Sequence, residues 1–372
     1  MKGRVIALLD RPAHAALVVD GRLEDLLLHA DHTTPVPRPG EIWAARVQRI
    51  VQGAAFVDLG HGHSGYLRGS KDLKGRTNLF PVQIASVAEP GKATPVDGRI
   101  LIKGRGLILS PNAPGINISR RIKTPEERDR LTAVFADLPE DTGLIVRSAA
   151  EELDDDTLRR EFEALSARAA HLEALSTRGP LDADHSAPRA IALREWTSPD
   201  PDMIAAGDNL AARLSAPDAL AQFGEDRDLQ DRLTPGDGDP FDHFGVWDEI
   251  ERLKSPRADL PSGGWMAIEA TRAMVTVDVN TGERFGQGDA MTTNIEAVRE
   301  LPRQLRLRGL GGQVILDFAP MKKMHRRKIE EELKRAFRHD PIDTTLAGWT
   351  PLGNFELTRK RERIPLGTLL PD

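Results

Sequence analysis

The sequence predicts an α+β protein that is made of several domains. Its 372 residues suggest two or three domains at the usual size of about 150 residues each, and 40% hydrophobic residues are enough to form cores. Short segments that alternate apolar and polar residues between glycine turns indicate strands near the N-terminus. A capping signal and longer charged segments indicate helices farther along the chain.

Composition excludes several classes of protein. No apolar run reaches the ~18 residues that a membrane helix needs. Arg4 and Asp10 interrupt the apolar stretch at the N-terminus, which makes it a poor signal peptide. The chain has no cysteine, so disulfides and thiolate-ligated metal sites are excluded. We therefore expect a cytoplasmic protein without a membrane segment.

The first 120 residues favour strands. Residues 3–28 indicate two or three short strands with a turn at 20–22, and a proline-rich boundary follows at 32–40. Next comes the segment 41–67, whose alternating residues and glycine turns are typical of a small barrel. We expect this barrel to extend to about residue 118.

The middle of the chain mixes helix and strand. A capping box, "TPEE" at 124–127, places Pro125 at the first position of a helix. A strand is expected at 143–148, and a long acidic helix is expected from about residue 155 to 176. Residues 177–245 combine strand, helix and loops rich in Pro, Asp and Gly.

The last part alternates strands with helices. We expect a hairpin over 260–280 and a helix over 290–308 that Pro302 interrupts or kinks. A strand at 313–318 and a basic helix at 322–338 complete this part.

Two acidic residues in apolar strands are the most informative feature. "VTVDVNTG" at 275–282 reads as a buried strand in which Asp278 and Asn280 share one face. Asp317 ends a second apolar run, "QVILDFAP". A buried carboxylate usually pairs with a cation or binds a metal, and two such oxygen ligands on neighbouring strands suit magnesium. An Asp that caps a turn or pairs with an Arg would give the same pattern.

The charge distribution favours a polyanionic partner near these acids. The net charge is −6, but the residues from Arg299 onward hold 16 Lys and Arg against 10 Asp and Glu. The preceding residues hold 35 against 47. The basic excess therefore lies beside the two strand acids in the sequence, although a solvated helix face would give the same count.

Three segments, which follow one another in the same order along the chain, closely resemble the catalytic region of the ribonuclease E/G endoribonucleases. They are "LPSGGWMAIEATRAMVTVDVNTG", "NIEAVRELPRQLRLRGLGGQVILDF" and "HRRKIEEELKRAF". The resemblance implies that Asp278 and Asp317 bind Mg²⁺, for which Mn²⁺ could substitute, and that Asn280 orients Asp278. It also implies hydrolysis of RNA that leaves a 5′-phosphate and a 3′-hydroxyl.

The resemblance extends to residues that would contact RNA. "GAAFVDLGHGHSGYL" at 53–67 resembles the core of the family's S1-type OB barrel, which implies that Phe56 and Tyr66 stack on single-stranded RNA. Phe56 could instead belong to the barrel core. Similar matches imply that RNA is also contacted by the basic residues Lys92, Arg120 and Arg121.

A third match concerns the 5′ end of the RNA. "GLIVRS" at 143–148 resembles the family's sensor of a 5′-monophosphate. By this resemblance Arg147 and Ser148 grip the terminal phosphate, and Gly104 and Ile108 line the pocket. A guanidinium and a hydroxyl suit that task, because both donate hydrogen bonds to phosphate oxygens.

Four cations follow Asp317 closely in the sequence, and two readings of them are open. They could contact the RNA backbone, which we favour, or they could form a solvated helix face. These cations are Lys322, Lys323, Arg326 and Arg327.

The resemblance also implies an order of domains. Residues 1–38 and 187–255 would form an RNase H-like subdomain that encloses the S1-type OB domain, 39–118, and the 5′-sensor region, 119–186. Residues 256–372 would form a DNase I-like catalytic subdomain.

Two departures from the family pattern limit what carries over. The family's zinc-binding cysteines are absent, so we expect no structural zinc, and either a monomer or a dimer that zinc does not link. The Arg-Phe-Gly of a late strand reads "PLG" at 351–353, so an Arg that faces RNA is missing. A non-catalytic RNA-binding protein and a magnesium hydrolase of another phosphodiester remain as alternatives.

Overall fold

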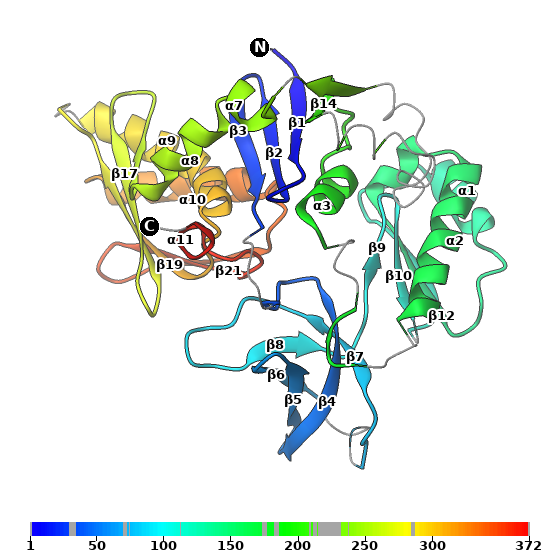
Figure 1. Cartoon of the computed structure of the whole chain (residues 1–372). Helices are drawn as coiled ribbons and strands as arrows, with labels where there is room; N and C mark the ends of the chain where they lie inside the picture. The colour runs from blue at the N-terminus through cyan, green and yellow to red at the C-terminus, as the bar shows by residue number, and fades with distance from the viewer. Residues whose placement is uncertain are drawn as a thin grey trace. The chain divides into compact units, whose positions relative to one another are not determined.

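The computed structural model describes most of the chain, which groups into two compact units (Figure 1). The first unit comprises Met1–Arg22 and Leu27–Phe244, and the second comprises Leu23–Leu26 and Gly245–Asp372. The described residues are 2–29, 35–69, 73, 75–111, 113–172, 177–181, 186–207, 210, 214, 232–236, 238–283 and 287–370.

One sheet of the first unit joins segments that lie far apart in the sequence. Strand β1 (Arg4–Leu9) pairs antiparallel with β2 (His14–Val19) and parallel with β14 (Met203–Gly207), which pairs in turn with β15 (Leu233–Gly236). Helix α3 (Pro188–Glu195) packs its apolar residues on this sheet.

The N-terminal strands agree with the prediction of two or three strands and a turn. The turn after β2 contains Asp20 and Gly21, both with a positive φ, and β3 (Arg22–Leu27) follows it. The expected proline-rich boundary at 32–40 lies partly outside the described residues. The short helix α7 (Pro240–His243) comes late in this unit.

The barrel is a closed structure of five strands, consistent with an OB fold. In spatial order the strands are β4, β5, β6, β8 and β7, and pairing of β4 with β7 closes the ring. The short strand β13 (Gly179–Pro180) also pairs with β4. The bounds are β4 (Ile42–Val51), β5 (Ala54–Gly60), β6 (His63–Arg68), β7 (Phe80–Ile84) and β8 (Thr94–Asp97).

Alternation along the strands fills the interior of the barrel. Val57 and Leu59 of β5 point inward with Trp43 of β4, whose indole N–H donates to Glu41 at 2.9 Å. The last strand of the barrel ends at Asp97, whereas we expected the barrel to extend to about residue 118. The cause is that the next strands pair in a different sheet.

That sheet has the order β11, β12, β10 and β9, and two helices cover its apolar residues. Helix α1 begins at Pro125 as predicted, but Thr124 makes no side-chain cap, so the expected capping box does not form. Helix α2 begins at Asp155, and Asp154 caps it by accepting from the backbone N–H of Thr157 at 2.7 Å. The bounds are β9 (Ile102–Lys103), β10 (Leu107–Pro111), β11 (Gly115–Ile118), β12 (Thr142–Val146), α1 (Pro125–Val134), η2 (Ser148–Glu152) and α2 (Asp155–His171).

The second unit is built on a sheet of six strands in the order β16, β17, β18, β19, β21 and β20. β17 and β18 form the predicted hairpin, whereas β18 and β19 are parallel. The strand bounds are β16 (Arg257–Asp259), β17 (Trp265–Ala270), β18 (Val275–Asn280), β19 (Gly312–Asp317), β20 (Thr344–Trp349) and β21 (Phe355–Arg359).

Helices bury one face of this sheet. Val277 of β18 and Leu316 of β19 pack with Leu301 of α9 and Leu333 of α10 in one core. Helix α9 continues through Pro302, so the expected interruption is absent. The helices are α8 (Val246–Lys254), α9 (Gln287–Leu307), η3 (Lys323–His325), α10 (Arg326–Phe337) and α11 (Leu366–Leu369).

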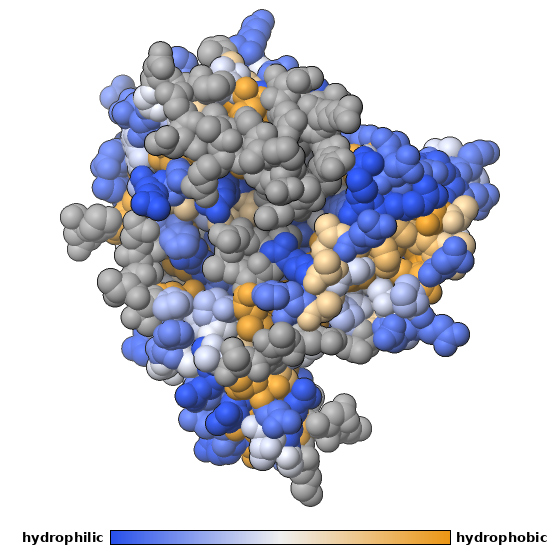
Figure 2. Space-filling view, turned by 45° about the vertical axis from the view of Figure 1, so that its right-hand side comes forward, coloured by the Kyte–Doolittle hydropathy of each residue, from blue (hydrophilic) through white to orange (hydrophobic). Residues whose placement is uncertain are grey.

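Within the described ranges, no helix is both long and apolar enough to cross a bilayer. Figure 2 shows one face of the molecule, on which hydrophobic residues form small patches among hydrophilic ones.

Buried ion pairs connect helix α9 with the end of strand β21. Asp340 accepts from Arg306 at 2.6 Å and from Arg359 at 2.9 Å. The side chains of Asp340 and Arg359 are 1% and 0% exposed. Removal of one member of such a group leaves the other charges buried without compensation.

We expect Asp340→Ala to lower the free energy of unfolding by about 3–5 kcal/mol, because the buried guanidinium of Arg359 loses its carboxylate. Arg306 keeps its contacts with Glu24 and Asp25. Urea unfolding followed by circular dichroism measures the change. Asp343→Ala is the control, since Asp343 is exposed and its loss should cost less than about 0.5 kcal/mol. Equal stability of the two variants would contradict the structural role of Asp340.

Candidate active site

The two predicted acids lie opposite each other on neighbouring strands. Asp278 of β18 and Asp317 of β19 are direct partners in the parallel register, which places their α-carbons about 5 Å apart. Alternation assigns Val277, Val279 and Leu316 to the buried face. Both carboxylates therefore project from the opposite face of the sheet.

The acids are exposed, which corrects the expectation that they are buried. The cause is that the helices cover only the face of the sheet that carries the valines and leucines. Within the described part of the chain, neither acid forms an ion pair, so the alternative of an Arg partner finds no support there. Exposed carboxylates without a cation are free to accept an external one.

Asn280 lies where an orienting residue would lie. Its side-chain amide donates to Oδ2 of Asp278 at 2.8 Å. This bond leaves the other oxygen of Asp278 available and restricts the rotation of the carboxylate.

The residues fit a hydrated magnesium ion. Among the described residues, no group of three or more His, Asp or Glu side chains could hold a metal. An ion at this edge would therefore have two protein carboxylates and would complete its shell with water and substrate oxygens. This is the ligation that Mg²⁺ favours beside phosphates.

Asn294 supports this edge of the sheet, although the sequence gave no specific signal for it. This fully buried residue of α9 donates to the carbonyl of Ala319 at 2.9 Å and accepts from its N–H at 3.0 Å. The paired bonds fix the chain two residues beyond Asp317. Both polar groups of this buried amide are thereby paired, as buried polar groups usually are.

The four basic residues after Asp317 have different surroundings. Lys322, Lys323 and Arg327 are exposed, and Arg327 pairs with Glu331 at 3.1 Å. Arg326 is half-buried, and its guanidinium lies 4.7 Å from the ring centroid of Trp349. Lys322 and Lys323 are thus the better placed for a polyanion, while Arg326 also serves packing.

The predicted stacking residues meet on the surface of the barrel. Phe56 and Tyr66 are direct partners on β5 and β6, with ring centroids 5.5 Å apart. Both are half-buried, and neither belongs to the barrel core. Arg49 places its guanidinium 4.8 Å from the centroid of Phe56. The pair is therefore an outward aromatic surface with a cation, rather than core packing.

The other predicted RNA contacts of the first unit are exposed. Lys92 lies in the loop between β7 and β8, and it pairs with Glu89. Arg120 and Arg121 come after β11, from which Ser119 separates them. Each of them is accessible to a ligand.

Arg147 already has a carboxylate partner. Its guanidinium donates to both oxygens of Glu195 and to the carbonyl of Gly104 at 2.7 Å. Burial alone would raise the pKa of Glu195, but the charges of Arg147 and Arg194 lower it below its ordinary value. A phosphate at Arg147 would have to compete with Glu195, a residue that sequence reasoning did not identify.

The other predicted sensor residues surround this pair. Ser148 is half-buried at the start of η2, and Ile108 is half-buried on β10. Gly104 has no room for a side chain, because a Cβ there would lie 1.8 Å from the carboxylate of Glu161. Gly104 is therefore required by close packing, in addition to any role in a pocket.

Glu161 of α2 is a buried acid beneath this region. Both of its oxygens accept from the N–H of Gly106 at 3.1 Å. Burial raises the pKa of Glu161 to about 7, although hydrogen bonds from the backbone partly oppose the shift.

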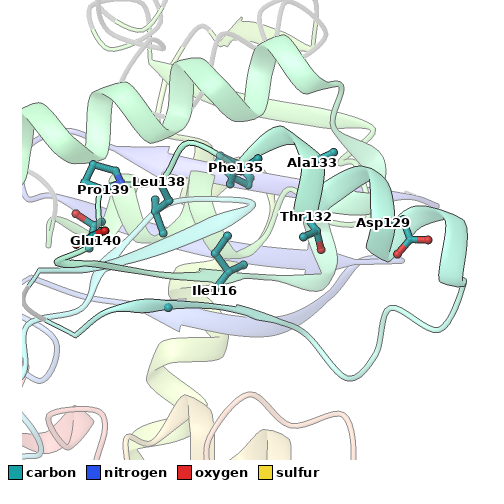
Figure 3. A pocket seen from close by; sticks show the side chains of 11 residues that line it. Ile116, Asp129, Thr132, Ala133, Phe135, Leu138, Pro139 and Glu140 are labelled. Carbon is teal, nitrogen blue, oxygen red and sulfur yellow. The ribbon is translucent and has the colours of Figure 1, made fainter.

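A pocket of about 580 Å³ lies between α1 and the strands β11 and β12 (Figure 3). Ile116, Phe135 and Leu138 line its middle, with Asp129 toward one end and Glu140 toward the other. No basic side chain lines it. It is unsuited to a phosphate, so it does not extend the candidate site.

Residues 101–362 match the model of the Ribonuclease E/G family. Ribonuclease G of Escherichia coli (strain K12) is 32% identical over 87% of this chain and 73% of its own length. Ribonuclease G of Salmonella typhimurium is 30% identical over the same shares. Ribonuclease E of a Nostoc species is 30% identical over 94% of this chain and 54% of its own length.

We expect wild-type stability to fall as pH rises from about 4.5 to 7. In this window Glu161 ionises in the unfolded chain, but the folded protein keeps it protonated, since its pKa is raised from 4.5 to about 7. The loss should be on the order of 3 kcal/mol. Urea unfolding at several pH values measures it.

Glu161→Gln should remove that part of the pH dependence and leave the variant more stable than the wild type at pH 8. Glu163→Gln, on the exposed side of the same helix, should keep the wild-type profile. A Glu161→Gln profile parallel to the wild type would show that Glu161 does not titrate in this range.

Proposed function

Because the chain belongs to the Ribonuclease E/G family, we propose that it is a magnesium-dependent endoribonuclease specific for single-stranded RNA. The observation that carries the proposal is the pair of exposed carboxylates on partner positions of two parallel strands. The proposed reaction adds water to a phosphodiester and breaks the bond to the 3′ oxygen. The products are a 5′-phosphate and a 3′-hydroxyl.

Asp278 and Asp317 would hold the ion, and Asn280 would keep Asp278 in the ligating orientation. A bound Mg²⁺ or Mn²⁺ supplies an acidified water and neutralises charge on the reacting phosphate. Asn294 keeps the backbone beyond Asp317 in place by its two hydrogen bonds to Ala319.

Single-strand specificity would come from the aromatic pair of the barrel. Phe56 and Tyr66 present ring surface that accepts any unpaired base, whereas bases within a duplex are not accessible for stacking. Lys92, Arg120 and Arg121 would add charge in the first unit, and Lys322 and Lys323 would add it beside the acids.

Several finer assignments belong to the same proposal. We assign the sheet of β1, β2, β14 and β15 to an RNase H-like subdomain, and the six-stranded sheet to a DNase I-like subdomain. The barrel would be of the S1 type. A cytoplasmic role in RNA processing or decay follows from this assignment. Without cysteine ligands we expect a protein free of structural zinc, which elemental analysis tests.

A non-catalytic RNA-binding protein is the main rival, because the aromatic pair and the exposed cations would suffice for binding. Incubation of a labelled 5′-monophosphorylated single-stranded RNA with and without Mg²⁺ separates the two functions. Products with 5′-phosphate ends that form only with the ion support the enzyme. Binding without products at any ion concentration supports the rival.

We expect Asp278→Asn and Asp317→Asn each to lower the cleavage rate more than about 1,000-fold, because a metal ligand is lost. RNA affinity without metal should change little, since it rests mainly on the barrel and the cations. Single-turnover cleavage and anisotropy titration measure the two quantities. Asn280→Ala should have a smaller effect. Unchanged turnover in both Asp variants would rule out this site.

A further prediction concerns the 5′ end of the RNA. A 5′-monophosphate should be cleaved roughly ten- to a hundredfold faster than a 5′-hydroxyl or a triphosphate, since it gains charged hydrogen bonds from Arg147 and Ser148. Arg147→Ala should remove the preference and leave cleavage of 5′-hydroxyl RNA nearly unchanged. Initial rates on the three substrates test this.

Glu195 bears on the interpretation of that assay, because it holds the guanidinium in the free protein. Equal wild-type cleavage rates on all three 5′ ends would mean that Arg147 has only a structural role, as the ion-pair partner of Glu195.

A further inference from the structure

A tryptophan stands on the open face of the catalytic sheet. Trp265 is the first residue of β17 and is half-buried. Its neighbours Met266 and Ile268 enter the core of the second unit, but Trp265 is not among the side chains that pack on that core. Alternation thus directs this indole to the face that also carries the two acids.

The strand register brings Trp265 close to the candidate metal ligands. Trp265 is the direct partner of Asn280, and Ala267 is the direct partner of Asp278. Trp265 is therefore the diagonal neighbour of Asp278, at about 7 Å between α-carbons or somewhat more. Because Ala267 has a small side chain, no bulky group of β17 stands between the indole and Asp278 on this face of the sheet.

A cation accompanies the indole. The guanidinium of Arg257, on the adjacent strand β16, lies 5.0 Å from the ring centroid of Trp265. Its side chain is 54% exposed and also pairs with Asp259 at 2.7 Å. A solvent-exposed cation is attracted to a ring face only moderately, so a ligand can displace the guanidinium from the indole.

We propose that Trp265 and Arg257 bind the nucleotide beside the scissile phosphate. The base stacks on the indole face that Arg257 covers in the free protein, and Arg257 moves to a backbone phosphate. This inference rests on the proposed endoribonuclease function. Stacking on Trp tolerates any base, so the pair would fix the position of the strand over Asp278 and Asp317 without selecting a sequence.

The observations favour RNA over an apolar partner at this surface. Among the described residues, the indole is a single aromatic group beside exposed charges, Arg257, Asp259 and Glu269, rather than part of an apolar patch. A flat ring with an adjacent cation matches a base with its phosphate. The same face carries the carboxylates that would meet the phosphodiester.

A binding experiment tests stacking without cleavage. Single-stranded RNAs with one 2-aminopurine at successive positions are bound to the full chain in EDTA, and the fluorescence of the analogue is recorded. The wild type should quench the analogue strongly at one position through contact with the indole. Trp265→Ala should abolish this quenching, and Trp265→Phe should preserve part of it. Quenching that is unchanged in Trp265→Ala at every position would overturn the proposal.

Cleavage gives the second readout. Trp265→Ala should lower kcat/KM roughly ten- to a hundredfold, and removing the base at the quenched position should lower it equally in the wild type. Trp265→Ala combined with the RNA that lacks this base should lower kcat/KM no more than either change does alone. Additive losses would show that the indole does not contact that base.

Arg257→Ala should weaken RNA binding less than Trp265→Ala does. It should also lower the slope of log affinity against log salt concentration by the amount expected for about one phosphate contact. The matched control is Arg272→Ala, which removes an exposed cation from the turn at the opposite end of the same hairpin. Arg272→Ala should leave the quenching and kcat/KM unchanged. An equal effect of both variants would show that only net charge matters at Arg257.

The outcome separates this inference from the proposed function. Loss of quenching in Trp265→Ala is measured without metal, so it does not depend on Asp278 or Asp317 being catalytic. Asp278→Asn that retains cleavage would refute the active site even if stacking is observed. Normal quenching in Trp265→Ala with loss of cleavage in Asp278→Asn would refute only the role of Trp265.

Discussion

The parallel pairing of β18 with β19 is the constraint on which the candidate site depends. Two adjacent parallel strands need a crossover connection, and helix α9 supplies it between them. The crossover helix buries one face of the sheet through residues such as Val298 and Leu301. Since alternation has a period of two, the acids of both strands are directed to the other face together.

Buried charges hold the framework around this sheet. Arg306 and Arg359 share Asp340, while Arg363 pairs with Asp25 of the N-terminal segment that belongs to the second unit. Arg303 reaches the same segment by donating to the carbonyl of Leu23. Residues that lie about 280 positions apart in the chain are thereby fixed to α9, so the helix is anchored at both its apolar and its charged faces.

The two candidate RNA-contact regions use cations in opposite ways. In the second unit, Lys322 and Lys323 are exposed, and Arg257 pairs with Asp259 but keeps 54% of its side chain exposed, so a phosphate can reach these charges. In the sensor region Arg147 is already matched by Glu195. A phosphate that binds Arg147 must displace the carboxylate of Glu195. Its net gain in binding free energy is therefore smaller than that of a phosphate at a guanidinium without a carboxylate partner.

The sequence by itself determined most strands and helices outside residues 177–245, and it singled out Asp278, Asn280 and Asp317, because alternation and helix periodicity are local properties. Asp278 and Asn280 on one face, and the hairpin before them, follow from spacing alone. Tertiary structure decided the features that depend on how strands pair and on which helices cover them. It exposed the acids and ended the barrel at Asp97. It also paired Arg147 with Glu195, because a residue 48 positions away is not visible in any local pattern.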